Sequence, residues 1–299
     1  MRNELYFAED IIMNEHTELS SKKESGYLHQ NFRLFHLKDK KTPEFEFHYH
    51  NFNKIIIFLS GNVTYLVEGK AYYLKPWDIL LVNHHDIHKA VIDPGTTYER
   101  IIIWLQNDFI KSQKDRPCDL SACFATANEK RFNLIRLNAT LQTKIQTLIH
   151  SLEDSLTSEE FGHEVLSQTY FLQLMVYLNQ VFTPEQYEEN QSASKYDKQI
   201  ADILKYINLH LDEDLSNEAL SEKFFLSKYY LMHKFKEETG YTLHNYIQQK
   251  RLICASDMIK GGTPVLKAAS QCGFFDYSTF FARFSQNVWH ISEGSYCLI

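Results

Sequence analysis

"FLSKYYLMHKF", residues Phe225–Phe235, and "FFDYSTFFARF", residues Phe274–Phe284, repeat one another at an offset of 49 residues. The offset aligns Ser227 with Asp276, and both are good helix N-caps because their side-chain oxygens accept hydrogen bonds from the first turn. Apolar residues follow each cap at four-residue steps, which predicts one buried stripe on each helix. These two stretches therefore predict a pair of equivalent helices.

A shorter helix is expected before each of these two. The first begins at the N-cap Ser216, with Glu218 in the first turn where the helix dipole favours an acidic group. The second begins with Thr263 as N-cap and Pro264 at the first helical position, and Gly273 ends it with a tight turn. Each copy of the repeat therefore predicts a helix-turn-helix motif.

A long helix is predicted between the two motifs, over the stretch "TLHNYIQQKRLICASDMI". Its expected buried residues are Leu243, Tyr246, Ile247, Leu252 and Met258. Two motifs joined in this way could place two recognition helices about one DNA turn apart, ~34 Å, on one face of a duplex. A duplicated packing unit without a DNA-binding role remains the alternative.

Charge alone does not predict a nucleic-acid partner. Residues 195–299 hold 12 basic and 12 acidic residues, and the remaining 19 basic and 26 acidic residues give the chain its net charge of −7. DNA binding must therefore be argued from the motifs. The length of 299 residues favours two or three domains.

Membrane and disulfide-rich classes are not favoured. The longest apolar runs fall far short of the roughly 20 residues of a membrane-spanning helix. Acidic residues near the N-terminus interrupt any signal-peptide core. The expected location is the cytoplasm, where free thiols are the expected state of the cysteines because no two form a Cys-x-x-Cys pair. The five cysteines are Cys118, Cys123, Cys254, Cys272 and Cys297.

The region from Phe32 to Leu105 has a β pattern of short aromatic and β-branched runs separated by turn residues. It predicts a small antiparallel barrel or sandwich. From about Leu134 to Phe182 the period becomes helical, and two amphipathic helices are expected there. The predicted fold class is thus α+β, an N-terminal antiparallel β-barrel with a helical segment and a C-terminal all-α domain.

Four parts follow from these patterns. Residues 1–130 are expected to form the β-barrel domain, to which the family resemblance below adds effector binding, and 131–182 a helical segment that packs on the barrel or pairs two subunits. The polar stretch 183–197 is expected to be a linker, and 198–299 the domain with two helix-turn-helix motifs.

The last hundred residues resemble the AraC/XylS family of bacterial transcription regulators. The family often carries a cupin-like effector domain, a dimerisation segment and a linker before its two motifs, and the front of this chain fits that layout. The matching residues are Leu215, Leu220, Ser227, Leu231, Phe235, Lys236, Gly240, Tyr246, Arg251, Ala255, Ala269, Gly273, Phe274, Ser278, Phe280 and Phe284.

The resemblance weakens after Phe284. The family usually continues there with a basic pair, a glycine, Ser-Pro and an arginine, whereas this chain reads "FSQNVWHISEGSYCLI". Ala282 also stands where an arginine is frequent, although Arg283 is adjacent.

The start of each recognition helix is expected to read base edges. Other basic residues are expected to hold phosphates, which adds affinity without sequence information. The base-edge candidates are Lys228, Tyr229, Met232 and His233 in the first motif and Tyr277, Ser278, Phe281 and Arg283 in the second. The phosphate candidates are Lys234, Lys236, Lys250 and Arg251.

Histidines stand in the predicted barrel where metal-binding cupins carry theirs. Such cupins use His-x-His, an acidic residue four or five positions on, and a later third histidine. His48, His50 and His88 fit, but Lys54 occupies the acidic position, where an ammonium repels a cation. No metal or other cofactor is therefore expected. A small polar effector, a sugar by preference, is expected instead at His48, His50, Tyr65, Tyr73, Trp77 and His88.

The preferred interpretation is a ligand-responsive transcription regulator and not an enzyme. Its expected partners are promoter or operator DNA, the carbohydrate effector and a second copy of the chain, with RNA polymerase as a further candidate and no membrane. A cupin metalloenzyme using His48, His50 and His88 is the alternative. A third hypothesis, a relative impaired in DNA binding that acts through proteins, rests on the altered residues after Phe284.

Overall fold

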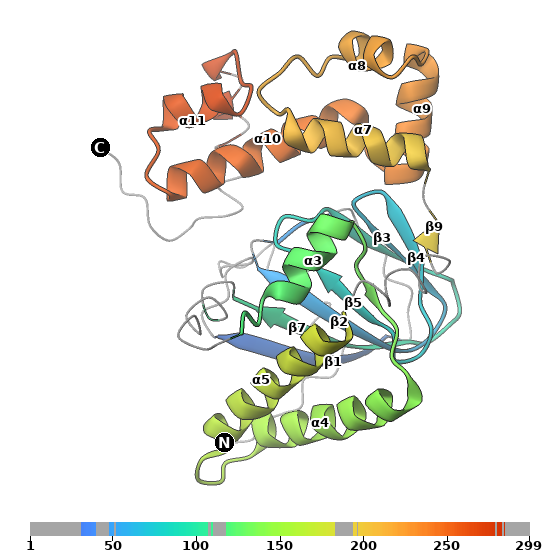
Figure 1. Ribbon diagram of the computed structural model, residues 1–299, viewed down its shortest axis with the longest axis vertical. Coiled ribbons are helices and arrows are strands. Elements are labelled where there is room, and N and C mark those ends of the chain that lie inside the picture. The colour runs from blue at the N-terminus through green and yellow to red at the C-terminus, as the bar shows by residue number, and fades with distance from the viewer. Residues whose placement is uncertain are drawn as a thin grey trace. The chain divides into compact units, whose positions relative to one another are not determined.

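The β pattern between Phe32 and Leu105 forms two antiparallel sheets, which confirms the predicted α+β class (Figure 1). One sheet has the strand order β1-β7-β2-β5-β8 and the other β6-β3-β4-β9. The strands are β1 (Phe32–Asp39), β2 (Asn53–Ser60), β3 (Val63–Val67), β4 (Lys70–Tyr73), β5 (Ile79–Val82), β6 (His88–Ile92), β7 (Tyr98–Leu105), β8 (Leu134–Ile135) and β9 (Ser194–Lys195).

The structure is a computed structural model. It describes residues 31–39, 48–50, 52–106, 109, 118–182, 194–195, 197–278, 280–282 and 284. The described chain divides into two units: the first runs to Ser194, and the second holds the residues from Lys195 onward together with Glu68–Ala71. Most of the predicted linker lies outside the described residues.

The centre of the first unit is strand β2, where Ile55, Ile56 and Ile57 are all fully buried. Successive residues of a strand face opposite sides of the sheet, so both faces of β2 must be covered. Val63 and Val67 of the second sheet belong to the same apolar core as the isoleucines. The two sheets therefore enclose one face of β2, and the helices cover the other.

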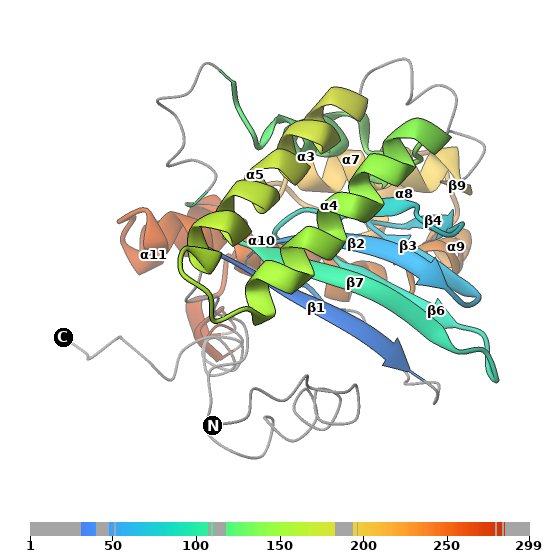
Figure 2. The same cartoon turned by 90° about the horizontal axis from the view of Figure 1, so that it is seen from below.

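The covering helices are α4 (Ala139–Thr157) and α5 (His163–Val181), which lie side by side across the sheet of β1, β7 and β2 (Figure 2). The rings of Phe32 on β1 and Phe171 on α5 stack with their centroids 4.3 Å apart. A shorter helix, α3 (Ala122–Lys130), precedes them. The leucine stripe of the sequence is thus largely core of the same unit.

The predicted start of this helical region was wrong by several residues. Leu134 and Ile135 form strand β8, which pairs with β5. The helix begins only after Asn138, whose side chain caps it by accepting a hydrogen bond from the Leu141 N–H at 3.0 Å. Apolar residues pack equally well in a strand or a helix, so periodicity alone misplaced the boundary.

An ion-pair group joins β1 to its neighbours through His36. The imidazole contacts Glu153 of α4 at 2.9 Å and Glu99 of β7 at 3.2 Å. The hydrogen bond to Glu153, opposed by partial burial and helped by both carboxylates, raises the pKa of His36 above its ordinary value.

This raised pKa predicts a loss of stability with rising pH. Protonated His36 contributes fully below the ordinary histidine pKa of about 6.5, and the contribution disappears as the pH rises through the higher folded-state pKa. The groups are partly exposed, so the expected loss is below about 1 kcal/mol. Thermal unfolding at both ends of this window should fall with pH more in the wild type than in His36→Gln, and equal falls would contradict the assignment.

The second unit is helical, as predicted. Its helices are α7 (Lys198–Leu209), α8 (Asn217–Lys223), α9 (Lys228–Thr239), α10 (Leu243–Lys260) and α11 (Val265–Gln271). The backbone is helical again at residues 277–278, 280–282 and 284, after the N-cap Asp276.

The predicted caps are confirmed with one exception. The hydroxyls of Ser216 and Ser227 each accept a hydrogen bond from a first-turn N–H at 3.2 Å, and Asp276 accepts from the Ser278 N–H at 3.0 Å. In α11 the cap is Pro264 rather than Thr263, so the helix begins one residue later than expected.

Candidate functional site

The first recognition helix is α9, and its buried residues determine which side chains face outward. Leu231 and Phe235 are fully buried, which directs the opposite side of the helix to the surface. Tyr229 is 80% exposed, Met232 is also exposed, and the Tyr229 and His233 rings stack one turn apart with centroids 6.0 Å from each other. We call Tyr229, Met232 and His233 the recognition face of α9.

Two lysines on this helix are already engaged by acidic groups. The Lys228 ammonium pairs with Glu218 of α8. Lys234 lies 2.7 Å from Glu238, and this hydrogen bond raises the Lys234 pKa. A phosphate would have to displace these carboxylates, so the predicted phosphate contact of Lys234 is weakened.

Arg251 was expected to hold phosphate, but the structure gives it another role. Its side chain is buried, and the guanidinium donates hydrogen bonds to the carbonyl oxygens of Leu211 at 2.8 Å and Glu213 at 2.7 Å. Burial lowers the Arg251 pKa, although not enough to neutralise a guanidinium. The residue ties α10 to the loop before α8 and does not belong to the surface that could meet DNA.

The other two phosphate candidates differ in exposure. Lys236 is exposed on α9. Lys250 on α10 is largely buried, with 12% of its side chain exposed and its ammonium 5.6 Å from the centroid of the Tyr246 ring. Lys236 is therefore the better placed of the two.

The second motif repeats the arrangement of the first. Phe280 is fully buried and packs edge-to-face against Phe274, while Tyr277, Ser278 and Phe281 are exposed. These three side chains occupy the outward side of the second recognition helix. Arg283 lies outside the described residues.

The turns of the two motifs are not equal in length. The left-handed turn residue is Phe225 in the first motif and Gly273 in the second, an offset of 48. The caps Ser227 and Asp276 remain offset by 49 because the second turn has one additional residue. The predicted alignment of Phe225 with Phe274 was therefore wrong, since an alignment without a gap conceals an insertion inside the turn.

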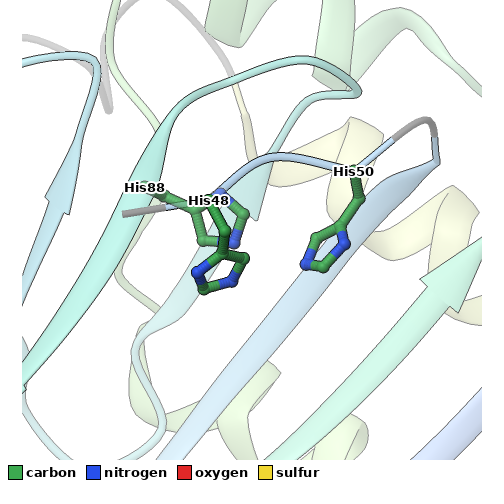
Figure 3. A group of neighbouring side chains, drawn as sticks. All are labelled: His48, His50 and His88. Atoms are coloured by element: carbon green, nitrogen blue, oxygen red, sulfur yellow. The ribbon is translucent and has the colours of Figure 1, made fainter. Parts of the chain in front are cut away.

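Three histidines of the first unit form a cluster, His48, His50 and His88 (Figure 3). Their ring centroids are 4.4 to 5.3 Å apart. Two backbone hydrogen bonds between His48 and His88, of 3.1 and 2.9 Å, fix their segments against each other. The structure thus has the three imidazoles close together, as the sequence predicts.

Burial determines the charge of the cluster. Desolvation, followed by the nearby Lys54 ammonium, holds the pKa of both His50 and His88 well below the ordinary value. Both imidazoles are therefore neutral at physiological pH and present a lone pair.

The other three residues predicted to bind the effector, Tyr65, Tyr73 and Trp77, lie outside the histidine cluster. Tyr65 is buried on the inner face of β3, and its hydroxyl accepts a hydrogen bond from Tyr98 at 3.2 Å. Tyr73 is 52% exposed on β4, because the adjacent Tyr72 takes the buried side. Trp77 lies in the turn before β5 and packs on the core. The structure does not bring Tyr73 or Trp77 to the histidines.

Sequence reasoning missed two aromatic neighbours of His50. The buried Phe52 ring stacks on the His50 ring with centroids 4.7 Å apart. The Trp104 ring on β7 has its centroid 6.1 Å from that of His50, and its Nε1 is buried without a hydrogen-bond partner. Trp104 faces Lys54 across the β2–β7 ladder, and Lys54 is buried. Cross-strand register gives this neighbourhood, which a linear pattern does not contain.

A ligand-binding β unit joined to two helix-turn-helix motifs defines a DNA-binding transcription regulator. The model of an AraC-like ligand binding domain matches residues 34–175, and that of a helix-turn-helix domain matches residues 220–288. The chain belongs to the AraC/XylS family.

Known transcription activators are similar in sequence to this protein over most of its length. It is 24% identical to the HTH-type transcriptional activator RhaR of Mannheimia succiniciproducens, over 82% of this chain and 84% of the relative. It is also 24% identical to the activator RhaS of an Enterobacter species, over 86% and 91% of the two chains. Among solved structures, ToxT from Vibrio cholerae aligns with 15% identity over 88% of this chain and 100% of ToxT, with a TM-score of 0.36.

Among the helices that the structure describes, none is long and apolar enough to cross a bilayer.

Proposed function

We propose that this regulator binds DNA through the outward sides of its two recognition helices and responds to a small polar effector in the β unit. The observation that carries the proposal is that each recognition helix buries an apolar residue at the equivalent position, Leu231 in the first and Phe280 in the second. Each anchor leaves an aromatic-rich surface outward, namely Tyr229, Met232 and His233 in one motif and Tyr277, Ser278 and Phe281 in the other. Base edges in the major groove are the ligands that such helix starts fit.

The effector that the β unit suits best is a sugar. Neutral imidazoles accept hydrogen bonds from hydroxyl groups, and aromatic rings pack on the apolar face of a sugar ring. We place the effector at His48, His50 and His88, with Tyr65 on the same inner face of the β unit. Tyr73 and Trp77 are left out because of their positions.

A homodimer is the form in which we expect the protein to act, because the helix-turn-helix unit carries no net charge and one copy gains little from phosphates. Exposed apolar side chains at the α4–α5 end of the first unit could pair two copies; they are Leu156, Phe161, Val165 and Leu166. Promoter DNA places the protein in the cytoplasm, and RNA polymerase is a candidate partner there. We propose no enzymatic activity.

The recognition face can be tested by the double variant Tyr229→Ala/His233→Ala. Affinity for DNA from the gene's own upstream region should fall about tenfold or more, since each base contact is worth about 1–3 kcal/mol. The salt dependence should stay as it was, because neither residue neutralises a phosphate. Fluorescence anisotropy with labelled duplex measures both quantities.

Leu209→Ala is the control, because Leu209 is also a large exposed side chain of the helical unit but lies on α7. Equal affinities of the double variant and this control, with both proteins folded, would remove α9 from the DNA interface.

A further inference from the structure

The three-histidine cluster contains polar atoms that the fold itself leaves unsatisfied. The Nε2 atoms of His50 and His88 are buried and have no hydrogen-bond partner. A buried polar atom without a partner destabilises the fold, so a native site that keeps two of them side by side needs a physical reason. A ligand that binds both nitrogens would supply it.

The tautomer of His88 favours a particular kind of ligand. Its Nδ1 lies 2.9 Å from the carbonyl oxygen of Asp86, a hydrogen bond that requires the proton on Nδ1. The lone pair is then on Nε2, the buried atom inside the cluster. A carbonyl on the far nitrogen is the arrangement that orients histidine ligands of metal ions.

The distances between the ring nitrogens and the chemistry of imidazole indicate which metal ions could bind the cluster. One ring nitrogen from each of the three histidines lies within 4.8 Å of the others. Nitrogen ligands at about 2.0–2.1 Å from a tetrahedral ion are closer together than this, so modest rotation of the rings would close the site. Three imidazole nitrogens suit zinc, nickel, cobalt, copper or iron and do not suit magnesium or calcium.

We propose that His48, His50 and His88 reversibly bind one divalent first-row transition-metal ion, so that the β unit is metal-responsive. The proposal rests on the regulatory function proposed above and adds a ligand to its effector site. Lys54 takes part as the residue that limits affinity. A buried ammonium beside the imidazoles repels the cation and would keep the ion from being a permanent structural component.

The test uses full-length protein freed of metal with a chelator and contains no DNA. Zinc is titrated by calorimetry and cobalt by its visible absorption, which reports nitrogen coordination. We expect one ion per chain. His50→Gln should weaken binding at least about 100-fold, because removing a ligand costs more than the loss of an outer partner.

The Lys54 variant is the sharper part of the test. Lys54→Gln should tighten metal binding about tenfold or more, since it removes a like charge from a buried site. Lys130→Gln, an exposed lysine on α3, controls for net charge, and His150→Gln, an exposed histidine on α4, controls for surface histidines. Neither control should change the affinity.

Two outcomes would overturn the proposal. One is the absence of stoichiometric binding at about 1 mM ion, the affinity of the weakest protein metal sites. The other is binding that neither His50→Gln nor Lys54→Gln alters. DNA binding measured separately distinguishes the hypotheses, because a protein that binds its DNA without metal keeps the regulatory function while losing the metal site.

Discussion

Gly273→Ala should destabilise the helix-turn-helix unit by about 3 kcal/mol or more. Gly273 has φ +80°, where a Cβ alone costs roughly 1–2 kcal/mol. The added Cβ would also lie 2.2 Å from the Leu211 carbonyl oxygen and 2.9 Å from the Arg251 guanidinium carbon. The guanidinium donates a hydrogen bond to this carbonyl in the native structure, so making room also breaks a partly buried hydrogen bond.

The control for this variant is Gly262→Ala. Gly262 has a similar φ of +88°, but nothing lies within 4 Å of its added Cβ. Gly262→Ala should therefore lower the free energy of unfolding only by the cost of the left-handed backbone conformation, about 1–2 kcal/mol. Chemical denaturation of both variants measures the difference, and equal losses would show that the close approach at Gly273 does not hold the second turn.

Asp39→Asn should cost the first unit about 3–5 kcal/mol. Asp39 and Arg100 form an ion pair whose side chains are only 1% and 4% exposed. The Arg100 guanidinium carbon also lies 4.2 Å from the centroid of the Tyr98 ring, which covers one face of the guanidinium. Removing the carboxylate charge takes away the Asp39 counter-ion from a buried cation, which is the costly case.

Two further variants make this prediction specific. Asp154→Asn removes a carboxylate from an exposed pair with His150 and should change stability by less than about 1 kcal/mol. The double variant Asp39→Leu/Arg100→Met removes both charges and should recover much of the loss, since apolar replacements of buried pairs are often tolerated. A double variant as unstable as Asp39→Asn would mean that packing, and not the unpaired charge, explains the effect.

The helical half of the fold could be predicted because its signals are local. Ser216, Ser227 and Asp276 cap their helices through side chains two or three residues from their partners, a range that sequence spacing describes. The structural role of Arg251 could not be predicted from the sequence. Its carbonyl partners lie about 40 positions earlier, and only the folded chain brings them together.

The β unit was predictable in type but less so in detail. The His-x-His spacing predicted that His48 and His50 share a face, and the likeness to cupins added His88. The three form one cluster in the structure. Tyr72 and Tyr73 show the limit, because alternation requires one tyrosine inside and one outside without saying which. Trp104 was missed because its place beside His50 depends on the register between β2 and β7, which no short sequence motif carries.

The most direct test of the proposed regulatory function is whether the wild-type protein binds its own regulatory DNA. Fluorescence anisotropy with labelled DNA from the upstream region should give saturable binding that exceeds binding to a random duplex of equal length. The affinity should fall at least about tenfold between about 50 and 200 mM salt, because some of the contacts are to phosphates. An anisotropy that stays flat at low salt, or equal binding to both duplexes, would contradict the conclusion that the two recognition helices read DNA.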